Sequence, residues 1–134
     1  MTKLWTLAAG ALCAAVVAGC GTTTTSSSFK GAEHEAAQTI GNLQTYATAN
    51  EASKICSQLL SKSTVEGLGG HDGCEAAIKS QLKQVDSFEL ATKSVQVNGD
   101  HATAKVESLV SGKKKVQQVS LTKEGSSWKI TALE

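Results

Sequence analysis

From residue 88 to the end of the chain, apolar residues alternate with polar ones, and three short turn motifs interrupt the alternation. A period of two is typical of strands that bury one face. The turn motifs are Asn98-Gly99-Asp100, Ser111-Gly112 and Glu124-Gly125-Ser126. Because such tight turns join antiparallel neighbours, the sequence predicts a meander of about four strands. The apolar parity changes between Thr92 and Val95, which predicts a β-bulge near Lys93 or Ser94.

Upstream of residue 88 the apolar spacing is that of helices. Residues 32–49 predict one long amphipathic helix of roughly 27 Å, with an apolar face made of Ala36, Ile40, Leu43 and Ala47. Asn50 is expected to be the N-cap of a second helix, whose apolar face is made of Ala52, Ile55, Cys56, Leu59 and Leu60. Residues 63–73 are rich in glycine and predict a loop, and a third short helix is expected over residues 74–82. Helices followed by a meander indicate an α+β fold, in which the N-terminal helices pack on one face of a curved antiparallel sheet.

The N-terminal segment has the pattern of an export signal. Lys3 precedes an apolar run over residues 4–17, and this run is too short to span a membrane. The segment Val17-Ala18-Gly19-Cys20 resembles the lipobox of bacterial lipoproteins, in which the cysteine is acylated and becomes the first residue of the mature chain. The resemblance implies a signal peptide over residues 1–19, a palmitate-type lipid on Cys20, and a place on the extracytoplasmic face of the cell membrane. The alternative is a cytosolic domain with an apolar first helix, in which Cys13 or Cys20 is a core residue.

Residues 20–30 are expected to be a linker between this lipid and a single domain over residues 31–134. Eight Gly, Thr and Ser residues follow Cys20 without a charge among them. A flexible chain of that length spans about 15 Å, which lifts a domain just clear of the lipid head groups.

The charge composition argues against nucleic acid as a partner. Every basic residue is lysine, and without Lys3 the chain has 12 lysines against 12 acidic residues. Nucleic-acid-binding domains show clustered positive charge and usually arginine.

Two cysteines, Cys56 and Cys74, remain for the domain if Cys13 is removed with the signal and Cys20 is acylated. Outside the cytoplasm we expect them to form a disulfide, which would stabilise a small domain by roughly 3 kcal/mol. Two other interpretations stay open: a zinc site that adds His71 and Asp72 to the two cysteines, although no close cysteine pair exists, or two free thiols. We expect no metal, and no cofactor other than the lipid on Cys20.

Three segments of the domain carry a second resemblance: residues 49–60 as a second helix, residues 95–106 around the Asn-Gly-Asp turn, and the closing residues 121–133. Together they resemble small exported members of the nuclear transport factor 2-like superfamily, over residues 30–134. The resemblance implies a cone in which the curved sheet wraps the long helix, often with a pocket at the wide end, and often a homodimer through the sheet. Residues expected to line such a pocket are Tyr46, Phe88, Val106, Leu121, Trp128 and Ile130. Trp128 fits core packing as well as pocket lining.

Some members of that superfamily are dehydratases, isomerases or cyclases, but this sequence offers no convergent catalytic set. The inferred inward strand positions carry no titratable side chain, and Tyr46 and Asp86 are the remaining acid–base candidates. We therefore predict a protein that is not an enzyme. His34 and His101 are expected on the surface.

Three functions follow as expectations. The first is a non-catalytic, membrane-anchored cell-envelope domain that binds a protein partner or a second copy. The second is a binding protein for a small apolar ligand in the cone, and the third is an isomerase or dehydratase. Lys113, Lys114 and Lys115 are either a solvated hairpin end or a contact with an anionic membrane.

Overall fold

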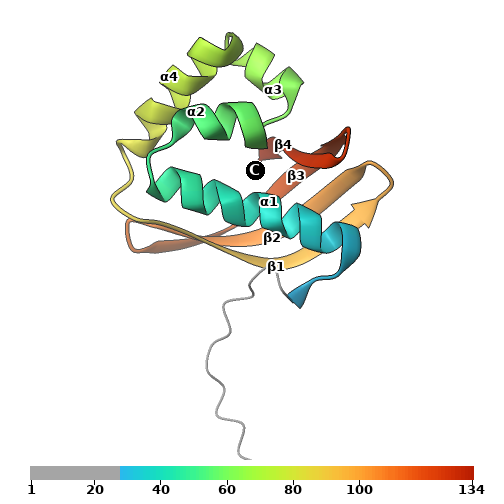
Figure 1. Cartoon of the computed structure of the whole chain (residues 1–134). Helices are drawn as coiled ribbons and strands as arrows, with labels where there is room; N and C mark the ends of the chain where they lie inside the picture. Colours follow the sequence, from blue (N-terminus) through green and yellow to red (C-terminus); the bar gives the residue numbers. More distant parts are fainter. Residues whose placement is uncertain (1–27) are drawn as a thin grey trace, which may run out of the picture.

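The computed structural model describes residues 28–134, and Figure 1 shows helices on one side of a curved sheet. The expected signal peptide, Cys20 and most of the linker lie outside the described residues. The helical elements are α1 (Gly31–Thr48), α2 (Ala52–Lys54), the π-helical turn η2 (Ile55–Leu59), α3 (Lys62–Gly67) and α4 (Gly70–Leu82). The strands are β1 (Phe88–Asn98), β2 (His101–Val110), β3 (Lys113–Glu124) and β4 (Ser127–Leu133). The predicted α+β fold is confirmed.

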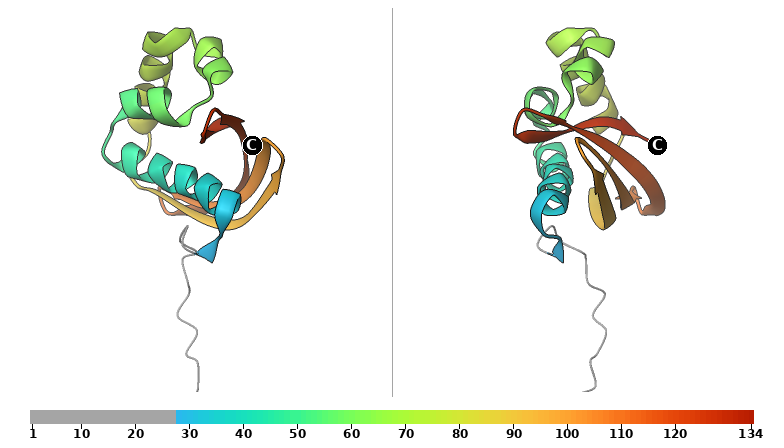
Figure 2. Two further views of the ribbon diagram at one scale, coloured as in Figure 1. Left: turned by 45° about the vertical axis from the view of Figure 1, so that its right-hand side comes forward. Right: turned by 90° about the vertical axis from the view of Figure 1, so that its right-hand side faces the viewer.

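The sheet is an antiparallel meander in the order β1-β2-β3-β4, as the sequence predicts. Its hairpins turn at the three predicted motifs, and Gly99 has the positive φ of 60° that such a tight loop needs. The predicted bulge is also confirmed, because the β1–β2 register shifts between Thr92 and Ser94. A second shift, between Ser120 and Leu121 on β3, adds curvature. Figure 2 shows the result, a sheet that wraps around α1.

Helix α1 ends in a Schellman motif, and this corrects the expected role of Asn50. Asn50 has a φ of 57°, its N–H donates to Ala47 O at 3.1 Å, and the N–H of Glu51 donates to Tyr46 O at 2.8 Å. Asn50 is therefore the left-handed residue that closes α1, and Glu51 occupies the N-cap position of α2. The same residue types favour both positions, so the sequence alone does not separate them.

The predicted loop over residues 63–73 is wrong, because this stretch forms α3 and the first turn of α4. The Ser61 side chain caps α3 by accepting from the N–H of Thr64 at 3.2 Å. Gly69 and Gly70 then reverse the chain with φ values of 94° and 79°. Val65 packs against the core, and this tertiary contact outweighs the poor helix propensity of the neighbouring glycines.

The core lies between the concave face of the sheet and the helices. Small side chains occupy both sides of this contact: Ala36 and Ala37 on α1, and Ala102 and Ala104 on β2. They let the helix and the sheet approach closely. Leu60 has already left η2 and forms an isolated parallel bridge to Ile130, so the second helix ends one residue earlier than the apolar pattern suggests.

Candidate functional site

A hollow opens where the end of α1, the end of α4 and the start of β1 meet, and it is called the α4–β1 hollow below. Its volume is about 550 Å³, within the range of about 300–1,000 Å³ that is usual for small-molecule sites. The lining residues come from these three elements and from the segments between them: Gln44, Ala47, Thr48, Asn50, Leu82, Lys83, Val85, Asp86, Ser87, Phe88 and Glu89.

The hollow has an apolar floor and a polar rim. Ala47 is buried, and Leu82, Val85 and Phe88 are half-buried. Lys83, Asp86 and Glu89 are exposed, so one ammonium and two carboxylates stand at the opening. Such a site fits a ligand that buries an apolar part and leaves a polar or charged part at the surface.

Backbone and side-chain hydrogen bonds hold the walls of the hollow. The Gln44 Oε1 atom accepts from the N–H of Leu90 at 2.8 Å, which ties α1 to the outer edge of β1. The Schellman turn at Asn50 fixes the end of α1. Ser111 N–H donates to Ser87 O at 3.4 Å, so the β2–β3 hairpin supports the segment between α4 and β1. The hollow is therefore built on ordered elements.

Of the six residues expected to line a pocket, only Phe88 lines the α4–β1 hollow. Val106, Leu121, Trp128 and Ile130 are at most 3% exposed and pack in the core. Trp128 therefore packs in the core, as the core-packing interpretation of the sequence expects, and the α4–β1 hollow opens at the helix ends.

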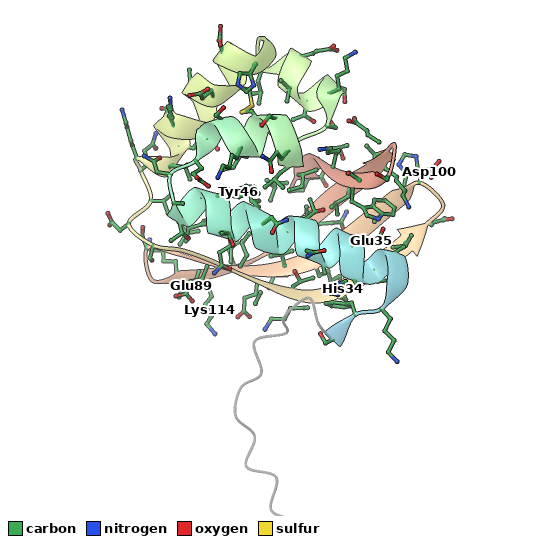
Figure 3. The ribbon with its side chains drawn as sticks, in the orientation of Figure 1. His34, Glu35, Tyr46, Glu89, Asp100 and Lys114 are labelled. Carbon is green, nitrogen blue, oxygen red and sulfur yellow. A yellow bond between two sulfur atoms is a disulfide. The ribbon has the colours of Figure 1, made fainter. Side chains whose placement is uncertain are left out.

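Trp128 packs beneath the first half of α1. Its backbone oxygen accepts from Thr39 Oγ1 at 3.2 Å, and the Lys123 ammonium lies 5.6 Å from its ring centroid. Glu35, on the same face of α1, lies 3.9 Å from that ammonium, and Figure 3 shows Glu35 beside the β3–β4 hairpin. The indole N–H is buried without a hydrogen-bond partner among the described residues. These contacts join α1 to the last hairpin.

Tyr46 is turned toward the second helix. Its hydroxyl donates to Gln58 Oε1 at 2.9 Å, and the Lys54 ammonium lies 5.3 Å from its ring centroid. A hydrogen bond from Lys54 to Glu51 raises the pKa of the Lys54 ammonium. Asp86 lies at the rim of the α4–β1 hollow, so the two acid–base candidates have different surroundings.

Cys56 and Cys74 form the predicted disulfide, which joins η2 to α4 with a Cα–Cα distance of 6.1 Å. Both residues are buried. His71 lies beside them in sequence, but its Nε2 atom is 3.3 Å from Ser53 Oγ. Within residues 28–134 no three His, Cys, Asp or Glu side chains gather as a metal site would require. The paired sulfurs are not available as zinc thiolates.

On the outer side of α4, Glu75 carries a perturbed carboxyl group. A hydrogen bond from the Lys79 ammonium, followed by the charges of Lys79 and His71, lowers the pKa of Glu75. This ion pair is separate from the α4–β1 hollow and is typical of i,i+4 pairs on exposed helix surfaces.

The sequence offers one signal for the residues of the hollow that the strand and helix patterns miss. Leu82, Val85 and Phe88 are apolar at a spacing of three across the junction between α4 and β1, and Val85 belongs to neither element. Gln44 and Asn50 carry no such signal, because polar residues are common at the end of a surface helix.

The fold is that of nuclear transport factor 2-like proteins. A variant of the protein named Rd1NTF2_05 superposes with a TM-score of 0.52 at 15% identity, covering 72% of this chain and 92% of that one. A structure described as the de novo designed NTF2 fold protein NT-9 gives a TM-score of 0.40 at 18% identity, over 72% and 75% of the two chains. No family model matches the sequence. No curated protein matches it either. Within residues 28–134, no helix combines the length and apolar character needed to cross a membrane.

Proposed function

We propose that this chain is a lipid-anchored protein of the bacterial cell envelope, and that its domain is a non-catalytic binding module. The binding site is the α4–β1 hollow, and the ligand is a small amphiphilic molecule. Its apolar part rests on Leu82, Val85 and Phe88, and its polar part meets the charged rim. The observation that carries the binding function is this hollow, with a volume of about 550 Å³.

The anchor rests on the residues around Cys20. The likeness of residues 17–20 to a lipobox supports acylation, and one acyl chain alone gives only marginal binding, so a lipoprotein cysteine carries two or more. The disulfide between Cys56 and Cys74 is consistent with folding outside the cytoplasm, where such bonds persist.

A binding role fits the hollow better than catalysis does. Proton transfer needs an acid–base group aligned with the substrate and supported by a second group. The Tyr46 hydroxyl is engaged with Gln58, and Asp86 stands at an exposed rim. The fold likeness is compatible with both ligand-binding proteins and enzymes, so this choice rests on the residues of the hollow.

Native mass spectrometry of the full chain tests the proposal. The protein is expressed with its signal in a bacterium and extracted from membranes in mild detergent. We expect an acylated Cys20, the mass deficit of one disulfide, and a co-purifying small molecule. A chain that keeps residues 1–19 and carries no acyl group would contradict the anchor, and a chain without an adduct would contradict the binding function.

Two matched variants locate the ligand. Thr48 lines the hollow, and Thr45 lies three residues earlier on the same helix outside it. Both are exposed, and each donates from its hydroxyl to the backbone oxygen four residues earlier. Thr48→Trp should fill the hollow and remove the adduct, whereas Thr45→Trp should keep it. Equal retention by both variants would place the ligand elsewhere.

A further inference from the structure

The face of the sheet turned away from α1, called the convex face below, carries lysines on three neighbouring strands. Lys93 lies on β1, Lys105 on β2 and Lys114 on β3, and all three are exposed. Figure 3 shows Lys114 and Glu89 below the sheet, on the side opposite α1. Lys113 and Lys115 stand beside Lys114 at the end of the β2–β3 hairpin and are exposed as well. The convex face and this hairpin end form one basic surface.

Acidic residues on the convex face do not neutralise this charge. The Glu107 carboxylate lies 3.7 Å from the Lys93 ammonium and 3.5 Å from the Lys114 ammonium. Glu89 is a second acid on this face, so two carboxylates stand against the five lysines of the surface. Glu107 also holds the two lysine chains side by side across the strands. The surface keeps a positive balance that long-range attraction can use.

An exposed aliphatic side chain lies among these lysines. Val116 is 65% exposed and stands opposite Glu107 on β3, two residues from Lys114. Cationic residues around an apolar side chain are typical of surfaces that rest at the boundary between lipid head groups and acyl chains.

The attachment point restricts which face can meet the lipid. Eight residues separate Cys20 from Phe29, and a chain of that length reaches at most about 30 Å when fully extended. In Figure 1 the start of the described chain lies at the lower end of the molecule, near the edge strand β1. A short tether at this end keeps the convex face close to the membrane.

We propose that the convex face and the β2–β3 hairpin end dock on an anionic lipid surface when the chain is tethered through Cys20. This inference rests on the proposed anchor. Docking turns the helices toward the compartment outside the membrane, with the Glu89 rim of the α4–β1 hollow on the lipid-facing side.

The size of the effect follows from the number of lysines. Each lysine near an anionic membrane favours the docked state by about five-fold. Lys113, Lys114 and Lys115 together favour it on the order of a hundred-fold. The attraction decays within one Debye length, about 8 Å at physiological salt and about 3 Å at 1 M, so high salt should release the domain.

Lysine footprinting on anchored protein measures the docking. The full chain, purified from membranes with its lipid, is reconstituted into vesicles of phosphatidylcholine, or of one part phosphatidylglycerol to two parts phosphatidylcholine. A membrane-impermeant acetylating reagent then labels the lysines, and mass spectrometry gives the rate at each one. We expect the labelling rates of Lys93 and Lys105 to be lower on the anionic vesicles by a factor of about ten or more. Lys62, which is exposed on the helical side, should react at the same rate on the two vesicle types.

A charge-matched pair of variants separates docking from general attraction. The triple variant Lys113→Gln, Lys114→Gln, Lys115→Gln should restore the reactivity of Lys93 and Lys105 on anionic vesicles. The control Lys54→Gln, Lys62→Gln, Lys79→Gln removes the same charge from the helices and should leave their protection unchanged. Protection that the first variant keeps, or that the control loses equally, would overturn the proposal. So would equal labelling of Lys93 and Lys105 on the two vesicle types.

Failure of the anchor gives a different result from failure of docking. If Cys20 carries no acyl mass and the chain does not float with phosphatidylcholine vesicles, the proposed anchor is contradicted, but docking is not. The Cys20 thiol of a Cys13→Ser chain can then be coupled to a maleimide-bearing lipid, and the same footprint decides whether the convex face docks.

Discussion

Two glycines in helices should respond with opposite signs to the same substitution. In α1, Gly41 is exposed, and a Cβ atom added there would meet nothing within 4 Å. In α4, a Cβ atom on Gly73 would lie 3.1 Å from the carbonyl carbon of Leu68, and closer still to its oxygen. The contact is with main chain, so a side-chain rotation cannot relieve it.

The magnitudes follow from helix propensity and packing. Alanine is favoured over glycine in an exposed helix by about 1 kcal/mol, and Gly41→Ala should raise the free energy of unfolding by that amount. Gly73→Ala gains no more than this and meets an overpacking cost of about 1–3 kcal/mol. The cost should lie at the upper end, because the neighbouring Cys74 is held by the disulfide and limits how far α4 can move. We expect a net loss of about 1–2 kcal/mol.

Urea unfolding of the oxidised full chain, followed by circular dichroism, measures both variants. With a slope of about 1–3 kcal/mol per molar urea, the two midpoints should differ on the order of 1 M, with wild type between them. A Gly73→Ala midpoint at or above that of wild type would refute the reasoning. It would mean that the α3–α4 junction relaxes freely around the added methyl group.

Further predictions concern the disulfide and Glu75. Removing the bridge with Cys56→Ala and Cys74→Ala should lower the free energy of unfolding by roughly 3 kcal/mol, since the bridge closes a loop with a sequence separation of 18; an unchanged urea midpoint would contradict this. The folded pKa of Glu75 lies below its unfolded value, so its contribution to stability is present above the unfolded pKa and is lost as pH falls through the folded pKa. A carboxyl titration followed by NMR should give a midpoint below that of an ordinary glutamate, and Lys79→Gln should move it upward; no movement would exclude the Lys79 hydrogen bond as the main cause.

The sequence predicts the sheet in detail because its signals extend over whole strands. On β2 the apolar residues Ala102, Ala104 and Val106 alternate, on β3 Val119 and Leu121 do, and a one-residue slip would expose them all. The change of parity between Thr92 and Val95 identifies the bulge for the same reason. The disulfide is predictable because only two cysteines remain once the signal and the acylated residue are assigned.

The helical half is less predictable because its decisive contacts are tertiary. Glycines in residues 63–73 favour a loop by propensity, but the Ser61 cap and the packing of the partly buried Val65 against the core stabilise helix α3. Asn50 fits a helix start or a helix end equally well, and the distinction depends on whether its φ is positive. These are backbone states that packing selects, and a hydrophobic period does not encode them.

The α4–β1 hollow lies away from most of the residues that the sequence suggests as a pocket lining, and its location shows how the site can vary. The concave residues beside Trp128, such as Leu121 and Ile130, are buried in the core cluster. The hollow instead uses the ends of elements and the segment between α4 and β1, where most side chains are exposed or half-buried. Substitutions at its exposed positions, such as Thr48 and Lys83, spare the core, whereas Leu82 and Phe88 pack against the core cluster. Ligand preference can therefore change without loss of the fold, and variants such as Thr48→Trp should report on binding alone.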